Sequence, residues 1–426
     1  MNLKFLRGKE TSNALWLIGG KVMQMILSLV VGILSARYLG PSNYGLISYG
    51  TALVNFFMCF CTLGINSIIV KDFFDHPEDR GRAIGSAVLM RAISSFCSCI
   101  LIIGIATLID YGDWTTVAVV ALCSISLLFH AFDTINYWFQ SQYKSKISSI
   151  ALFVAYAATS VYKIILLILN KSVFWFAFAT SVDYMVLGVL LLIFYKKHNG
   201  PKLGVSWATG KRLLSKSYHY IFSGMMVAIY AQTDKLMLKQ MLDEASVGYY
   251  ATATAICSMW TFVLSAIIDS MYPTIIQSFK ENKELFERKN RQLYAIVFYV
   301  SVFVSVGFLL LGGLAVRILY GEAYMPAVMP LKVVTWYTAF SYFGVARNAW
   351  MVCNDKQKYL KYMYIFAAIL NVGLNFILIP VWGPTGAAVA SLVTQIFTSI
   401  VLPYCIKDLR PNAKLMLQAI ALKDVF

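Results

Sequence analysis

Hydrophobic positions along the chain form long runs instead of short amphipathic stretches. A helix needs about 20 mainly apolar residues to cross a bilayer, and no run has the alternation of a β-barrel strand. The pattern therefore predicts an all-α polytopic membrane protein with about twelve transmembrane helices. We place these spans at residues 14–36, 43–65, 83–109, 114–140, 147–170, 173–195, 218–240, 249–271, 293–315, 328–351, 359–380 and 384–405.

Composition supports this class and excludes others. Of the 426 residues, 59% are hydrophobic and 13% are charged, against about 25% charged in soluble domains. A chain with so little charge cannot cover the surface of a water-soluble enzyme. Nucleic-acid binding would need a soluble basic face, so nucleic acid is not an expected partner. The pairs Cys59/Cys61 and Cys97/Cys99 point to different sides of a helix, and no metal site is expected.

The net charge of +16 is mainly a signal of orientation. The N-terminal and C-terminal tails and the loops on their side hold 25 Lys and Arg residues, and the opposite loops hold 3. Positive loops stay in the cytoplasm, and an even number of spans places both termini on one side. We therefore expect a multi-pass protein with both termini in the cytoplasm.

The spans divide into two halves of six. We predict an N-terminal lobe (1–195), a cytoplasmic linker that could form an interfacial helix (196–217), a C-terminal lobe (218–405) and a cytoplasmic tail (406–426). A faint repeat supports the division. In YLGPSNYG (38–45) and MLDEASVG (241–248), Leu39/Gly45 and Leu242/Gly248 recur at an offset of 203 residues. This arrangement favours a duplicated transporter whose site lies between the halves.

Polar residues within the spans are the candidates for function, because they are costly in hydrocarbon unless they face a cavity or each other. Unpaired Lys and Arg would suit an anionic substrate, particularly phosphate, and aromatic rings could stack on sugar faces. The candidate substrate-binding residues are Lys21, Gln24, Lys163, Tyr230, Lys235 and Arg347.

A second group of span residues could form structural ion pairs or couple transport to an ion. Arg91 and Asp133 lie at similar depth and could pair, as could Asp183 and Lys163. His130 and Asp133 could instead titrate as an ion or proton site, with a satisfied polar pair as the alternative. No cofactor is expected, and H⁺ and Na⁺ are the candidate coupling ions. The full group is Arg91, His130, Asp133, Asp183, Asp234 and Asp269.

Four segments resemble motifs of the bacterial polysaccharide flippases. This family comprises the O-antigen and capsule repeat-unit translocases of the multidrug/oligosaccharidyl-lipid/polysaccharide (MOP) exporter superfamily. The matching blocks occur in order along nearly the whole chain. They are SARYLGPSNYGLISYG (35–50), AQTDKLMLKQMLDEASVGYYATAT (231–254), LYGEAY (319–324) and NFILIPVWGPTGAAVAS (375–391).

The resemblance implies a fold, a substrate and a location. It implies two six-helix lobes around a central cavity and alternating access in a bacterial cytoplasmic (inner) membrane. The implied substrate is an undecaprenyl-diphosphate-linked oligosaccharide for O-antigen, capsule or exopolysaccharide biosynthesis. Membrane lipids and other polysaccharide assembly proteins are the implied partners. Related lipid II flippases carry arginines on the first, second and eighth helices. Here Lys21 is the only charge in its span and span 8 carries Asp269, which argues against lipid II as substrate.

Two other functions stay open. A cation-coupled multidrug antiporter could use the same fold, although its sites should favour acidic residues over basic ones. A membrane-embedded polysaccharide polymerase or glycosyltransferase would generally need a large extramembrane loop or a cluster of catalytic carboxylates, and neither is visible in the sequence. We therefore expect a transporter rather than an enzyme.

Overall fold

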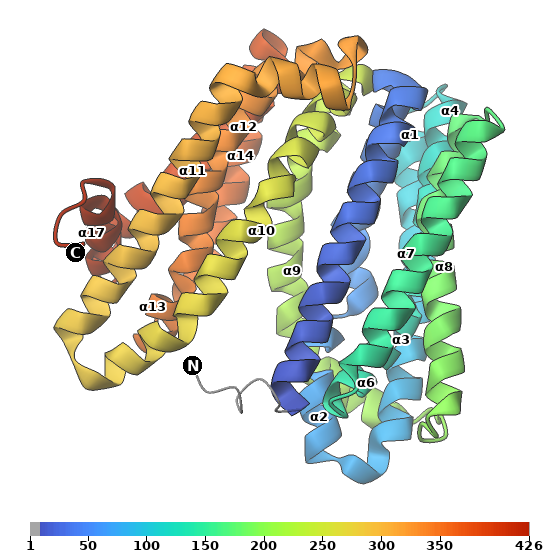
Figure 1. The fold of residues 1–426 in the computed structure, drawn as a ribbon. Helices are drawn as coiled ribbons and strands as arrows, with labels where there is room; N and C mark the ends of the chain where they lie inside the picture. The colour runs from blue at the N-terminus through green and yellow to red at the C-terminus, as the bar shows by residue number, and fades with distance from the viewer. Residues whose placement is uncertain (1–8, 426) are drawn as a thin grey trace. The chain divides into compact units, whose positions relative to one another are not determined.

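The computed structural model describes the backbone of residues 9–425 and the side chains of residues 24, 25 and 27–425. Within this range the chain is almost entirely helical and contains no strand (Figure 1), which confirms the all-α fold class. The helices are α1 (Lys9–Thr62), α2 (Ile69–Asp75), α3 (Arg80–Ile109), α4 (Trp114–Ser124), α5 (Ser126–His130), α6 (Thr134–Ser141), α7 (Ser145–Ile168), α8 (Val173–Lys197), α9 (Trp207–Met241), α10 (Glu244–Glu281), α11 (Lys283–Leu319), α12 (Val328–Ala346), α13 (Asn348–Cys353), α14 (Leu360–Trp382), α15 (Pro384–Ile396), α16 (Leu402–Cys405) and α17 (Arg410–Ile420).

Nine helical segments of the described chain are long and apolar enough to cross a membrane. The remaining predicted spans lie in the first part of α1, in α9, and in α12 together with α13. α9 carries charged residues along its length, and α12 is only 19 residues long before the chain breaks into α13. The predicted spans all fall on helices, and the architecture is that of a multi-pass membrane protein.

The first two predicted spans run together as α1, which bends at Gly40. The backbone of Gly40 has φ 73°, a left-handed conformation that favours glycine, and Pro41 follows it. Proline is well suited to the first turn of a helix because it needs no intrahelical N–H partner there. Gly40 and Pro41 therefore end one helical arm and begin the next without an intervening loop.

Within the predicted linker at 196–217, only residues 198–206 form a loop, because α8 ends at Lys197 and α9 begins at Trp207 and continues without a break. The segment 207–217 is therefore the start of a long helix and not a separate interfacial helix. The loop is held on α3, where the Gly204 N–H donates to the Gly81 carbonyl at 3.2 Å and the Ser206 N–H donates to Ser86 Oγ at 2.9 Å.

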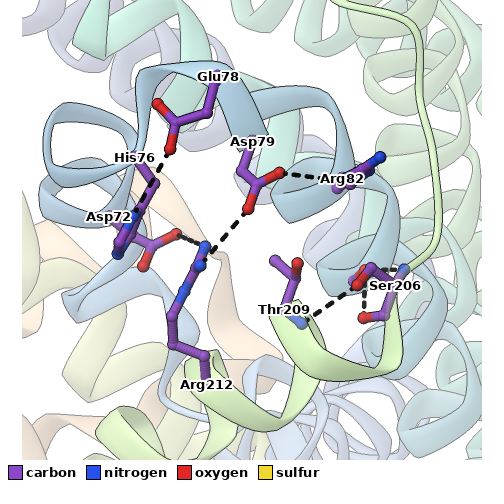
Figure 2. Close-up of polar contacts among 9 residues, drawn as sticks. Asp72, His76, Glu78, Asp79, Arg82, Ser206, Thr209 and Arg212 are labelled. Carbon is purple, nitrogen blue, oxygen red and sulfur yellow. Dashed lines mark hydrogen bonds and ion pairs between the residues drawn. The ribbon is translucent and has the colours of Figure 1, made fainter.

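Figure 2 shows the ion pairs that fasten the start of α9 to the segment around α2. Arg212 contacts Asp72 at 3.0 Å and Asp79 at 3.6 Å, and Asp79 also contacts Arg82 at 3.3 Å. The side chain of Asp72 is only 2% exposed, so this pair is shielded from solvent in a way that surface pairs are not. The loop before α3 and the start of α9 are thereby held together.

The predicted tail at 406–426 contains the packed helix α17. Its buried residues Leu415 and Met416 join a core that includes Leu293 of α11, and Asn412 Nδ2 donates to Tyr294 Oη at 2.6 Å. This segment is therefore part of the fold and not a free tail (Figure 1).

Contacts divide the chain into two compact units. The first unit consists of the chain up to Leu39 and of Leu46–Ala228. The second unit consists of Gly40–Gly45 and the chain from Ile229 onward. Each unit has its own buried core. The boundary between the two units therefore falls within α9, between Ala228 and Ile229, which is beyond the segment 196–217 at which the sequence suggests a division.

The 203-residue offset seen in the sequence extends to whole elements. α3 begins at Arg80 and α11 at Lys283, while α9 begins at Trp207 and α17 at Arg410; both pairs differ by 203. The α17 helix thus corresponds to the first part of α9. This agreement supports an internal duplication of the chain.

Gly45 and Gly248, the glycines of the repeat, make equivalent close contacts within the second unit. A Cβ atom at Gly45 would collide with the carbonyl oxygen of Glu244, and one at Gly248 would collide with the carbonyl oxygen of Pro41. Glu244 and Pro41 are also 203 residues apart. Each glycine therefore packs against the start of the other repeat's helix, which explains why this residue recurs in both turns.

Candidate functional site

The first unit contains a polar cavity of about 420 Å³ between α1, α4, α5, α7 and α8. Its side chains are mostly hydroxyl, amide and aromatic groups, with one basic and one acidic residue. The ones that bear on chemistry are Ser28, Asn55, Tyr156, Thr159, Lys163 and Asp183. A polar cavity within apolar helices is the kind of environment that such side chains require.

Lys163 and Asp183 share this cavity but do not form a direct ion pair. Thr159 Oγ1 donates to Asp183 Oδ1 at 3.3 Å, and Lys163 lies one helical turn further along α7. Lys163 and Asp183 attract each other electrostatically, without an ion-pair contact in the described part of the chain. The predicted pairing is therefore limited to electrostatic attraction without an ion-pair contact, and the ammonium group of Lys163 remains available to a ligand.

Gln24 and Lys21 belong to the α1 face predicted to bind substrate. Gln24 lies beside Tyr156, which lines the cavity. The side chain of Lys21 lies outside the described residues. The structure thus connects one of these two candidates to the cavity.

Arg91 is fully buried and bonds to neutral groups. It donates to Asn66 Oδ1 at 3.1 Å, to Thr134 Oγ1 at 2.8 Å and to the His130 carbonyl at 3.1 Å. That carbonyl lies at the break between α5 and α6, where residues 131–133 form a 3₁₀ turn. Asp133 attracts Arg91 without contacting it, so the predicted Arg91–Asp133 ion pair is not formed in the described structure. The oxygen acceptors for Arg91 come from the helix break and not from the Asp133 carboxylate.

The same arginine limits what His130 can do. The Arg91 guanidinium donates to His130 Nδ1 at 2.9 Å. Because a guanidinium cannot accept a hydrogen bond, Nδ1 must be the acceptor and the ring proton lies on Nε2. A second proton on the ring would displace Arg91. Asp133 lines a separate small cavity with Ser148, so His130 and Asp133 do not form a joint site.

A closed polar cluster surrounds Asp234 of α9 in the second unit. Asn375 Nδ2 donates to Asp234 Oδ1 at 2.7 Å and Ser391 Oγ donates to Oδ2 at 2.6 Å. Tyr250 also donates to Oδ2. Asn371 extends the cluster by donating to Ser391 at 3.2 Å and accepting from Asn375 at 3.1 Å. These residues come from α9, α10, α14 and α15, so the carboxylate joins four helices.

The oxygen atoms of this cluster would suit a small hard cation. The carboxylate, two carboxamides and two hydroxyl groups provide oxygen ligands of the type that such cations prefer. The Oδ1 atom of Asn375 is buried and has no partner among the described residues. An unpartnered buried acceptor beside a carboxylate is costly, and a bound cation would satisfy it.

Lys235 and Tyr230 lie near this cluster on α9. Lys235 is attracted to its neighbour Asp234 but forms no ion pair in the described part of the second unit. The hydroxyl of Tyr230 donates to Tyr337 Oη at 3.2 Å and accepts a hydrogen bond from Gln395. Tyr230 is thus fixed in a polar network, whereas the ammonium of Lys235 is free for a ligand.

The last two candidates lie in different environments. Arg347 is 6% exposed and donates to the Thr398 carbonyl at 3.0 Å, which belongs to a π-helical stretch at Phe397–Val401. Asp269 is exposed on α10 and has no partner among the residues that the structure describes. The structure does not bring either residue into contact with the Asp234 cluster.

The sequence analysis missed several members of these sites. Asn371 and Asn375 are four residues apart in an otherwise apolar span, so they share one helix face. That spacing is a signal that could have identified them. The roles of Tyr250 and Tyr156 had no comparable signal, because tyrosine is common throughout this chain.

Solved structures with a similar fold are transporters. The lipid II flippase MurJ in an inward closed conformation is 14% identical, with a TM-score of 0.70; the match covers 96% of this chain and 91% of that one. An inward-facing multidrug resistance MATE family transporter of the MOP superfamily is 13% identical, with a TM-score of 0.69. This match covers 93% of this chain and 96% of the transporter. The chain therefore has the fold of the MOP transporters, and its long apolar helices are those of a multi-pass membrane protein.

Sequence comparison identifies the family. The model of the polysaccharide biosynthesis protein family matches residues 11–279. Relatives named "Putative O-antigen transporter" from Escherichia coli (strain K12) and Shigella flexneri are each 21% identical, over 401 and 422 residues. The matches cover 92% of this chain and 95% and 96% of the relatives. The chain belongs to the polysaccharide biosynthesis protein family.

Proposed function

We propose that this protein is a flippase for undecaprenyl-diphosphate-linked oligosaccharide repeat units. It moves them across a bacterial cytoplasmic membrane by alternating access, for the assembly of O-antigen, capsule or exopolysaccharide. Family membership and the names of its relatives support a role in polysaccharide transport. The excess of basic residues on the terminus side supports an orientation with both termini in the cytoplasm.

The observation that carries this proposal is the cavity of the first unit. Its Lys163 ammonium has no direct ion pair among the described side chains, and hydroxyl groups, an amide and tyrosines line the same space. Phosphate is well matched by an ammonium group, and sugar hydroxyls are matched by neutral polar side chains. Lys163 is therefore the first residue that we assign to the diphosphate.

The other substrate candidates contribute to different extents. Lys235 has an unpaired ammonium in the second unit, and Gln24 contacts the cavity through Tyr156. Arg347 already donates to a backbone carbonyl, although its Nε is buried without a partner. We propose Lys163 and Lys235 as the principal basic ligands, with Lys21, Gln24, Tyr230 and Arg347 as supporting residues.

Coupling to an ion is a separate part of the proposal. The Asp234 cluster is the candidate site for Na⁺ or H⁺, because its oxygen atoms include the unpartnered Asn375 Oδ1. If Na⁺ binds there, NaCl should raise the unfolding temperature of the detergent-solubilised protein above that in choline chloride. The Asp234→Asn variant should lose this difference, whereas Asp269→Asn should keep it. An equal response in all three proteins would remove Na⁺ binding from the proposal.

A cation-coupled multidrug antiporter is the second candidate function. It is favoured by two carboxylates, the cavity-lining Asp183 and the buried Asp234, that form no direct ion pair with any residue whose side chain the structure describes. Such carboxylates could bind a cationic drug, whereas the free lysines oppose one. Efflux of a fluorescent cationic dye from energised vesicles would support this function, and the flippase proposal expects none.

Complementation tests the main proposal in cells. The gene should restore surface polysaccharide to a strain that lacks the flippase of the same assembly pathway. Lys163→Gln should fail at normal protein level, and Lys361→Gln, which alters an exposed lysine of α14, should succeed. Full complementation by Lys163→Gln would remove this residue from the site. Failure of the wild-type gene at normal protein level would contradict the proposed function.

A further inference from the structure

The second unit contains an apolar cavity that neither candidate site uses. It has a volume of about 350 Å³ and lies between α10, α11 and the last described residues of the chain. Met271, Ala295, Ile296, Tyr299, Leu422 and Val425 line it together with Gln292, and its polar groups are the Gln292 carboxamide and the Tyr299 hydroxyl. A water molecule needs two to four polar partners, so this cavity is built for hydrocarbon.

Specific hydrogen bonds hold the C-terminal wall of the cavity in place. Side chains of α11 donate to three backbone carbonyls of the terminal segment. Arg291 Nε binds the Asp424 carbonyl at 2.9 Å, Gln292 Nε2 binds the Val425 carbonyl at 3.0 Å, and the Tyr299 hydroxyl binds the Ile420 carbonyl at 2.7 Å. Val425 is 2% exposed as a result. The wall is therefore an ordered part of the second unit.

The surroundings of the cavity indicate where its occupant comes from. Ile296 and Tyr299 are 40% and 39% exposed, and further along α11 Phe303 is 81% exposed. Such an apolar helix face in a membrane protein contacts lipid. On the other side of the cavity, Lys289 Nζ donates to Gln292 Oε1 at 3.2 Å, within the charged segment 280–291. The cavity thus lies where the apolar part of α11 meets its basic end.

We propose that this cavity binds an acyl chain of an anionic glycerophospholipid, whose phosphate lies beside Lys289. The apolar lining takes the chain, and the adjacent lysine matches the negative charge of the headgroup. A bilayer phospholipid fits better than the lipid-linked sugar, because the described lining of this cavity offers an oligosaccharide only the Gln292 carboxamide and the Tyr299 hydroxyl. The site does not depend on the proposed transport function.

Photo-crosslinking tests the proposal on the intact protein. The purified chain is placed in nanodiscs that contain phosphatidylglycerol or phosphatidylcholine with a diazirine at the end of one acyl chain. After irradiation, mass spectrometry locates the lipid adducts. We expect adducts on residues 292–299 and 420–425, about fivefold more abundant with phosphatidylglycerol, which is the preference that one nearby lysine provides.

Matched variants distinguish binding of the acyl chain in the cavity from binding of the phosphate at Lys289. Lys289→Gln should bring the two lipids to parity, whereas Lys283→Gln at the start of α11 should not. Ala295→Leu, which fills the cavity, should reduce adducts from both lipids, and Ala315→Leu further along the helix should not. Equal labelling by both lipids in the wild type, or adducts spread evenly along α11, would overturn the proposal. Displacement of phosphatidylglycerol by undecaprenyl phosphate would overturn the assignment to a glycerophospholipid.

Discussion

The two candidate sites, one in each unit, accommodate polar groups in opposite ways. In the first unit, Lys163 and Asp183 face a cavity of about 420 Å³ and remain apart. In the second unit, Asp234 accepts hydrogen bonds from Asn375, Ser391 and Tyr250, so its carboxylate is enclosed. Polar groups are costly in hydrocarbon. In the first unit this cost is reduced because the groups face a polar cavity, and in the second unit it is reduced by hydrogen bonds to the carboxylate. The open site is suited to a ligand that enters and leaves, and the closed site to a small ion or a structural role.

The largest expected effect is the loss of stability when the closed cluster is opened. Asn375→Leu removes the donor to Asp234 Oδ1 and leaves part of a buried carboxylate unsatisfied. A buried group that loses its partner costs roughly 1–3 kcal/mol, and more when it is charged. We expect a destabilisation of about 3 kcal/mol, measured as the free energy of unfolding in detergent micelles.

A matched change in the open cavity provides the control. Asn55→Leu makes the same substitution at an exposed residue that lines the cavity of the first unit. Because no enclosed partner is lost, the free energy of unfolding should change by about 0.5 kcal/mol or less. Equal destabilisation by the two variants would show that the two sites do not differ as described.

The second expected effect is on transport. Lys163→Gln removes the free ammonium of the open cavity while keeping a polar side chain of similar length. A hydrogen bond to a charged group contributes about 1.5–3 kcal/mol, so the initial transport rate at low substrate concentration should fall about tenfold or more. The unfolding temperature should stay close to that of the wild type. A variant with unchanged transport, or one that fails only because it unfolds, would contradict a binding role for Lys163.

The smallest expected effect concerns an exposed ion pair outside the membrane-spanning segments of the second unit. Asp408 accepts hydrogen bonds from Lys356 at 2.9 Å and Tyr359 at 2.8 Å, and these lower the pKa of Asp408. The pair therefore stabilises the fold above the unfolded aspartate pKa of about 3.9, and this contribution is lost as the pH falls through the lower folded pKa.

Hydrogen exchange measures this local effect. Amides next to Asp408 should exchange slightly faster in Asp408→Asn than in the wild type at pH 7, and the difference should disappear when the wild-type carboxylate is protonated. Asp355→Asn is the control, because this exposed neighbour is not part of the pair. A difference that persists at low pH would mean that charge is not its cause.

The sequence predicts most of the helices, because a helix that crosses a bilayer must be long and apolar. Long apolar runs identify helices with little ambiguity. The recurrence of Gly45 and Gly248 indicates a repeat, and the starts of α3 and α11 show the same offset of 203 residues. The packing of residues 410–420 could not be predicted, because a short amphipathic segment gives no indication of the surface that it covers. The equivalence of α17 to the start of α9 becomes visible only with the structure.

The candidate sites were less predictable for a related reason. Hydropathy finds charged residues within spans but does not reveal their partners. Arg91 and Asp133 were expected to pair from their depth alone, yet the α5–α6 break offers Arg91 a carbonyl and a hydroxyl. Asn371 and Asn375 carry no charge and attract little attention in a sequence, although they enclose Asp234. Partners that come from distant helices require the three-dimensional arrangement.

Reconstituted transport tests the central claim most directly. The purified protein is placed in proteoliposomes with an undecaprenyl-diphosphate-linked fluorescent oligosaccharide, and translocation is followed by quenching of the label in the outer leaflet. We predict protein-dependent flipping of this lipid, at least tenfold slower with Lys163→Gln, and no protein-dependent transport of a cationic dye. Dye transport together with a flipping rate equal to that of protein-free vesicles would contradict the account.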